Sequence, residues 1–74
     1  MKFVQIENGS YVNANRIIRI YIDSTSGVTK EGIQITCYYV KLLFDAGYTS
    51  TYKHTNDKKE ADDFLAELIK TLEG

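Results

Sequence analysis

The chain has 74 residues, with 9 basic and 10 acidic side chains and a formal net charge of -1. A chain of this length makes one small domain, expected over residues 1–74, and its slight excess of acids excludes a protein whose main task is to neutralise phosphates. No stretch of about 18 apolar residues occurs in the sequence, so no membrane span is expected and we predict a cytoplasmic protein.

A core this small needs support, because it contributes no more than about 3–5 kcal/mol of net stability. Cys37 is the only cysteine and His54 the only histidine, which excludes an internal disulfide and a cysteine-based zinc site. We therefore expect no metal or other cofactor. Self-association is the support that remains, and we predict a homo-oligomer, specifically a homodimer, with a protein partner as the alternative.

The first predicted element is a hairpin, in which residues 3–7 and 10–13 alternate about Asn8-Gly9, a pair favoured by type I′ turns. A two-residue loop places Ile6 opposite Tyr11, so that Val4, Ile6 and Tyr11 are expected to face the core. Phe3 and Val12 are then expected on the opposite face.

The next elements are a bend, a strand and a loop. Asn13 and Asn15 are expected to bend the chain through their side chains. Ile18, Ile20 and Ile22 alternate with polar or aromatic residues, which predicts a strand with the isoleucines in the core. Residues 24–32 have turn composition and no periodicity, and we predict a solvated loop, with a contact loop as the alternative.

The longest predicted strand, residues 33–45, changes the phase of its apolar residues midway, which predicts a β-bulge or sharp bend near Tyr39 and Val40. A three-residue turn at residues 45–47 is expected to lead into the last strand. This pairing predicts Tyr48 and Tyr52 in the core and leaves outside Lys41, Leu43, Thr49, Thr51 and Lys53.

The final predicted element is an amphipathic helix from Asp57 to Glu73, with Asp57 and Glu60 forming a capping box and Gly74 ending the helix. Its apolar residues recur along one stripe: Ala61, Phe64, Leu65, Leu68, Ile69 and Leu72. The predicted fold class is α+β, with about five strands in a curled antiparallel sheet or small open barrel packed against this C-terminal helix.

No arrangement typical of an enzyme emerges from the sequence. Cys37, His54 and Asp45 could form a nucleophile, a base and an orienting carboxylate, but the expected register places Asp45 and His54 at opposite ends of one hairpin. We therefore predict a protein that is not an enzyme.

The predicted function is that of a non-enzymatic interaction or accessory module. Its candidate interaction surface contains the apolar, aromatic and basic residues expected outside the core: Phe3, Val12, Arg19, Tyr21, Tyr38, Lys41, Leu43 and Lys53. The alternative is a single-stranded nucleic-acid-binding protein that stacks bases on the outer sheet face, using Tyr21, Tyr38, Arg19, Lys41 and Lys53.

The beginning of the chain contains Asn8-Gly9, then Tyr11-Val12-Asn13, and then a characteristic spacing from Asn13 to Ile17 and Ile20. In these features it resembles the small bacterial FlbD family of flagellar proteins. The residue match covers about the first twenty positions, and the order of elements is similar over most of the chain. The resemblance implies a non-enzymatic bacterial accessory protein, but it assigns no functional residue because the shared positions are turn and core positions.

Overall fold

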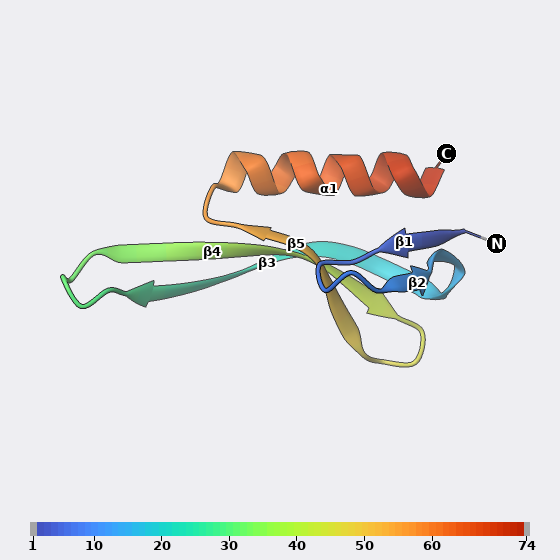
Figure 1. Cartoon of the computed structure of the whole chain (residues 1–74), viewed down its shortest axis with the longest axis horizontal. Helices are drawn as coiled ribbons and strands as arrows, with labels where there is room; N and C mark the ends of the chain where they lie inside the picture. The colour runs from blue at the N-terminus through green and yellow to red at the C-terminus, as the bar shows by residue number, and fades with distance from the viewer. Residues whose placement is uncertain (1, 74) are drawn as a thin grey trace.

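The computed structural model describes residues 2–73, which form two antiparallel sheets and one C-terminal helix (Figure 1). The elements in chain order are β1 Phe3–Gln5, β2 Tyr11–Asn13, the 3-10 helix η1 Ala14–Arg16, β3 Ile17–Val28, β4 Gln34–Phe44, β5 Thr49–Thr55 and α1 Lys58–Glu73. Strands β1 and β2 form one sheet, and β3, β4 and β5 form the other, with β4 in the centre. The fold is therefore α+β as predicted. The sheet is not closed, and the structure does not confirm a barrel.

The core lies between α1 and one face of the three-stranded sheet, which we call the inner face. Because alternate residues of a strand share a face, Val40, Leu42 and Phe44 of β4 all point toward α1 and are at most 1% exposed. Leu68 of α1 is 0% exposed and packs in the same cluster. The central strand thus supplies three of the five buried hydrophobic residues that lie outside the helix in residues 2–73.

Helix α1 begins close to the predicted residue. The carboxylate of Asp57 accepts a hydrogen bond from the Lys59 amide at 3.0 Å, as expected of an N-cap. The Asp57 amide donates to the Thr55 hydroxyl at 3.2 Å, so the reciprocal bond predicted from Glu60 is replaced. Gly74, which was expected to end the helix, lies outside the described residues.

The N-terminal segment is fastened to both layers of the domain. The amide of Glu7 donates to the carbonyl of Thr51 in β5 at 3.1 Å, which covers part of the outer edge of that strand. The Lys2 ammonium group donates to the carbonyls of Thr71 and Leu72 at 3.1 and 3.2 Å. A cation at this position also opposes the negative end of the helix dipole.

The predicted register of the first hairpin is wrong by one residue. The observed pairs include Val4 with Val12, so Val12 faces the core and Tyr11, at 65% exposed, faces solvent. Gly9, with φ of 91°, has positive φ, whereas no described non-glycine residue does, so Asn8 does not take the conformation that a type I′ turn requires. The loop instead contains three residues and closes with the Ile6 amide donating to the Ser10 carbonyl at 2.9 Å.

The bend after β2 forms as predicted, with the Asn13 side chain accepting from the Asn15 amide at 2.9 Å. Strand β3 then differs in one position, because its register shifts between Ile17 and Arg19. Ile18 occupies this bulge and is 64% exposed, although it was predicted in the core. Ile20 and Ile22 pack against the core as expected, but both are only partly buried.

The predicted loop at residues 24–32 is mostly strand. Strand β3 continues to Val28, β4 begins at Gln34, and the two pair along this whole stretch. The turn is confined to a few residues, where the Thr29 amide donates to the Ile33 carbonyl at 2.8 Å and Gly32 has φ of 82°. Composition was misleading here because small polar residues are compatible with a strand that is exposed on both faces.

The predicted irregularity near Val40 exists, but the extra residue lies in the neighbouring strand. Val40 pairs with Lys53 and Lys41 pairs with Thr51, which leaves Tyr52 of β5 as the unpaired residue. Strand β4 itself pairs with β3 without interruption. The phase change in its sequence therefore marks a change in which face is apolar, and Ile35 and the other odd-numbered residues of β4 lie on the face away from the helix.

The last hairpin turns at residues 45–47 as predicted, with Gly47 at φ of 92° and the Phe44 amide donating to the Tyr48 carbonyl at 3.0 Å. Tyr52 is buried as predicted. Tyr48 was expected in the core but is 57% exposed. Its ring stacks on Phe44 with centroids 4.7 Å apart, so it covers the end of the core while its other side meets solvent.

The packing of α1 can be tested with two neighbouring helix residues. Replacing the fully buried Leu68 by alanine removes methyl groups from the centre of the core, and we expect it to lower the free energy of unfolding by about 2–5 kcal/mol. Ile69 is 39% exposed, and Ile69→Ala is the matched control, expected to lose under about 1.5 kcal/mol. Urea denaturation followed by circular dichroism measures both losses. Equal losses would contradict the position of the helix.

A second test concerns the pH dependence of stability. Burial, together with the hydrogen bond to Glu67 at 2.7 Å, raises the pKa of Tyr52 to about 12. Because the folded state favours the protonated hydroxyl, this stabilisation is complete below the ordinary tyrosine pKa of about 10 and is lost as the pH rises toward 12. The same hydrogen bond, and a second one from Lys53, lower the pKa of the Glu67 carboxyl.

We expect Tyr52→Phe to lower the free energy of unfolding by about 1–2 kcal/mol at neutral pH. We also expect the variant to lose less stability than the unsubstituted chain between about pH 10 and 12. Tyr11→Phe is the control, since Tyr11 is exposed. Denaturation at a series of pH values measures the free energy of unfolding of the three proteins. If all three lose the same stability across this range, the protonation of Tyr52 is not linked to folding.

Candidate interaction surface

The face of the three-stranded sheet turned away from α1, here called the outer face, carries no layer of its own within residues 2–73 (Figure 1). Leu42 and its partner Ile20 point toward the helix, so the residues on either side of each point the opposite way. This alternation brings together four of the eight residues of the predicted surface: Arg19, Tyr21, Lys41 and Leu43. Arg19 pairs with Leu43, and Tyr21 pairs with Lys41.

The other four residues do not join this group. Tyr38 shares the parity of Val40 and lies on the inner face, and the bulge at Tyr52 turns Lys53 toward the helix. Val12 packs against the core, and Phe3 is exposed on β1, in the separate N-terminal sheet. The predicted surface therefore divides, and both the one-residue shift in the first hairpin and the bulge in β5 contribute to this division.

The cations of the outer face are already engaged within the chain. The Arg19 guanidinium lies 5.0 Å from the centroid of the Tyr21 ring, and the Lys41 ammonium lies 5.7 Å from that of Tyr39. Lys41 also pairs with the carboxylate of Asp23 at 3.5 Å. Aromatic rings covered by cations, in a patch that contains its own carboxylate, are poorly placed to stack nucleic-acid bases.

The three residues considered as a nucleophile, a base and an orienting group have other neighbours. Nδ1 of His54 lies 2.6 Å from a Glu7 carboxylate oxygen, and its ring stacks on Tyr39. Asp45 pairs with Arg16 at 3.4 Å. Cys37 is half-buried in β4. Nor do the residues that the structure describes contain a group of three or more histidine, cysteine or acidic side chains able to hold a metal ion.

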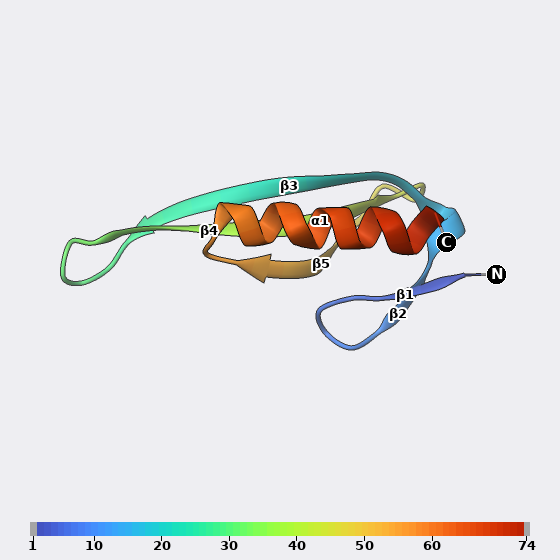
Figure 2. The ribbon, with the colours of Figure 1, turned by 90° about the horizontal axis from the view of Figure 1, so that it is seen from above.

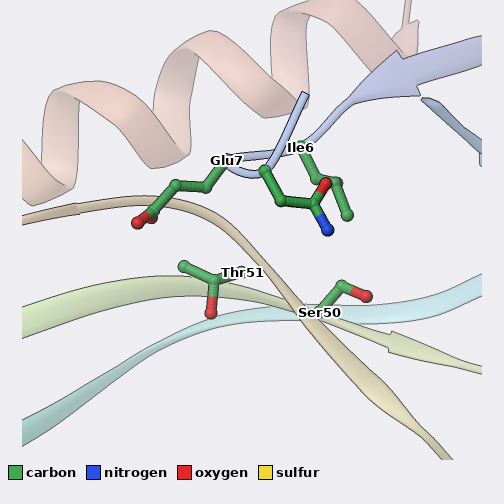
Figure 3. Close-up of a pocket in the computed structure, with 5 residues that line it drawn as sticks. Ile6, Glu7, Ser50 and Thr51 are labelled. Carbon is green, nitrogen blue, oxygen red and sulfur yellow. The ribbon is translucent and has the colours of Figure 1, made fainter. Parts of the chain in front are cut away.

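A groove of about 400 Å³ lies between the N-terminal hairpin and β5 (Figure 3). It is lined by Ile6, Glu7, Asn8, Ser50 and Thr51. Glu7 is its one charged residue and already pairs with His54, while the remaining polar groups are hydroxyls and one amide. This lining defines no particular ligand.

The free edge of β3 is the feature that sequence reasoning missed. Strand β3 has 12 residues and, within residues 2–73, pairs on one side only, with β4 (Figure 2). The Thr29 amide donates to the Ile33 carbonyl, and because hydrogen-bonded pairs alternate along an antiparallel ladder, the odd-numbered residues of β3 bond to β4. The amides and carbonyls of Ile20, Ile22 and Ser24 therefore point outward. The Ser24 amide accordingly donates to the Asp23 carboxylate at 2.9 Å rather than to the ladder.

The far end of the β3–β4 hairpin, residues 24–37, forms an arm that extends beyond α1 and β5 (Figures 1 and 2). The chain measures 48 Å along its longest axis, and its radius of gyration of 13.7 Å exceeds the roughly 11 Å expected of a compact chain of this size. Val28, Ile33 and Ile35 are exposed on the arm. The arm thus presents apolar side chains that the domain itself leaves uncovered.

Comparison with protein families, with curated proteins and with solved structures finds no match to this chain. The helix of the structure is not long and apolar enough to cross a membrane within the described residues. The function is therefore inferred from the residues of the chain itself.

The arm should be the least stable part of the sheet. A two-stranded ribbon with both faces in solvent is marginal on its own, so we expect its ladder amides, such as Thr25 and Cys37, to exchange with deuterium roughly a hundred times faster than those of Tyr21 and Lys41. Hydrogen exchange followed by NMR at low micromolar concentration measures this ratio. Equal protection in the two regions would contradict an unsupported arm.

Proposed function

We propose that this chain is a non-enzymatic interaction module that takes up an extended strand from another polypeptide along the free edge of β3. The observation that carries the proposal is the outward row of backbone groups at Ile20, Ile22 and Ser24, which bond to no neighbouring strand within residues 2–73. Such a row is a template for β-strand addition, in which main-chain hydrogen bonds supply affinity and alternate side chains supply specificity.

The composition of β3 supports this reading. Proteins protect exposed edges by keeping them short, by placing proline or charged residues, above all lysine, on them, by β-bulges, or by covering them. Strand β3 is long and contains neither proline nor lysine. It carries Arg19 and Asp23 and one bulge, at Ile18, beyond which its register is regular. The opposite edge of the sheet, in β5, is partly covered by the N-terminal hairpin through the bond from Glu7 to Thr51. The β5 edge is thus partly covered and the β3 edge is not, which favours the β3 edge as the binding edge.

Half-exposed apolar side chains along this edge also support the proposal. Ile20 and Ile22 face the core but remain partly exposed, whereas Val40 and Leu42 on the adjacent strand are 0% exposed. An added strand would bury the isoleucines further. The accessory role implied by the resemblance to the FlbD family is compatible with such a module. A protein partner also explains the edge better than a nucleic acid does, because Lys41 pairs with Asp23 and Arg19 lies over the Tyr21 ring.

The test uses a strand probe and isotope-labelled protein. A short capped peptide of alternating threonine and valine, with lysine at both ends, is titrated into the chain at low micromolar concentration. We expect shift changes and slower exchange at the amides of Ile20 and Ile22, which gain partners, and little change at those of Tyr21 and Asp23, which are already in the ladder. A labelled single-stranded oligonucleotide is titrated in parallel at low salt and is expected not to bind.

A proline variant provides the control. Ser24→Pro removes an outward amide that β4 does not use, so it should preserve the fold, by circular dichroism, and weaken peptide binding. Ser24→Ala keeps the amide and should bind like the unsubstituted chain. Peptide effects confined to residues away from β3, or binding of the oligonucleotide with a steep salt dependence, would reject the proposed function.

A further inference from the structure

The outward backbone groups limit how strand β3 can pair with a second copy of itself. In a symmetric antiparallel pair, hydrogen-bonded pairs of residues alternate with pairs that are not hydrogen-bonded. Because the free groups belong to the even-numbered residues, each even-numbered residue must meet another even-numbered one. The twofold axis then passes through a residue of β3. We consider the residues from Arg19 to Asp23, which follow the bulge and precede the arm.

Charge distinguishes among these registers. An axis at Arg19 or at Asp23 would place two like charges directly opposite each other, which is destabilising. An axis at Ile20 or Ile22 would set Tyr21 opposite one of the charged residues. An axis at Tyr21 places Arg19 of each copy opposite Asp23 of the other, so that two pairs of opposite charges form at once.

The same register brings the partly exposed isoleucines together. With the axis at Tyr21, Ile20 of one copy lies opposite Ile22 of the other, and both pairs are hydrogen-bonded pairs on the inner face. These are the two core-facing residues of β3 that a single copy leaves partly exposed. The ladder would extend from Ile18 to Ser24, and it would end near Ile18 because the bulge interrupts the strand there.

Arg19 and Asp23 could form the new pairs after an exchange of partners. Within residues 2–73, Arg19 takes part in no ion pair and lies over the Tyr21 ring. One carboxylate oxygen of Asp23 lies 3.5 Å from Lys41, and the other accepts from the Ser24 amide at 2.9 Å. In the paired sheet the Ser24 amide would donate instead to the Ile18 carbonyl of the second copy. The second oxygen of Asp23 would then be available to Arg19.

We propose that the β3 edge binds a second copy of this chain in this register, forming one continuous antiparallel sheet with Tyr21 of both copies at the twofold axis and both α1 helices on the same face. The proposal rests on the proposed function, because it names the occupant of the same edge. It also explains how a chain with one small core gains further apolar burial.

The first test exchanges the charges. Sedimentation measures the dimer dissociation constant of the unsubstituted chain, of Arg19→Asp, of Asp23→Arg and of the double variant. Each single reversal sets like charges opposite each other at two positions and is expected to raise the dissociation constant about tenfold or more. The double variant restores opposite charges and is expected to return to within about threefold of the original value.

The second test locates the axis with a disulfide. Residues of an antiparallel pair that is not hydrogen-bonded lie about 4.5 Å apart at Cα, within the reach of a disulfide. In a Cys37→Ser background, Tyr21→Cys is therefore expected to form a covalent dimer rapidly under mild oxidation. Asp23→Cys in the same background is the matched control. The two copies of that position would lie four residues apart along the paired strands, roughly 13 Å, which is too far to link.

The outcomes separate this proposal from the proposed function. Charge complementation together with selective cross-linking of Tyr21→Cys supports it. The proposal is overturned if the chain stays monomeric up to about millimolar concentration, because a dissociation constant above that value means only weak binding. Single reversals without effect, or equal cross-linking of the two cysteine variants, also overturn it. If the threonine–valine peptide still protects Ile20 and Ile22 in that case, the edge binds a different polypeptide and the proposed function stands; if it does not, both fail.

Discussion

The structure depends on the two-sided pairing of β4 and on the alternation of its side chains. The backbone groups of this strand form hydrogen bonds to β3 on one side and, along much of its length, to β5 on the other. Its inner face presents Val40, Leu42 and Phe44 to α1. The Tyr52 bulge in β5 adds hydrogen bonds between the sheet and the helix. The Tyr52 hydroxyl and the Lys53 ammonium both donate to the Glu67 carboxylate, at 2.7 and 3.2 Å. Strand β4 and the Tyr52 bulge in β5 therefore both help to position the helix on the core.

The sequence predicted those parts of the fold in which local chemistry and periodicity agree. The cap at Asp57, the bend at Asn13 and the turn ending at Gly47 appear as expected. The amphipathic stripe also appears, except that Ile69 is exposed. The predictions from the sequence were wrong where one local pattern is compatible with two structures. Asn8-Gly9 suits both a two-residue turn and a three-residue turn with glycine as the bulge, and the difference of one residue exchanges Tyr11 for Val12 in the core. The phase change in β4 likewise suited either a bulge or a change of apolar face.

The candidate surface was predictable only in part for the same reason. Arg19, Tyr21, Lys41 and Leu43 share a face because β3 and β4 pair in a regular register from Arg19 onward. Tyr38 and Lys53 lie on the opposite face, one through the true phase of β4 and the other through the bulge in β5. The free edge of β3 was not foreseen, because the polar composition of residues 24–28 indicated a loop. A serine-rich and threonine-rich segment can be a strand when its neighbour supplies the ladder, and only the fold specifies that neighbour.

The free edge of β3, a strand of 12 residues, connects the proposed binding and the proposed self-association with the small size of the core. A single copy leaves its outward amides to water and its edge isoleucines partly exposed, and a second copy could satisfy both. An isotope-filtered NOESY spectrum of a mixture of labelled and unlabelled chains tests this most directly. The account predicts a cross-peak between the Hα protons of Arg19 in one copy and Asp23 in the other. An equilibrated sample at high concentration with no intermolecular cross-peak to β3 would contradict it.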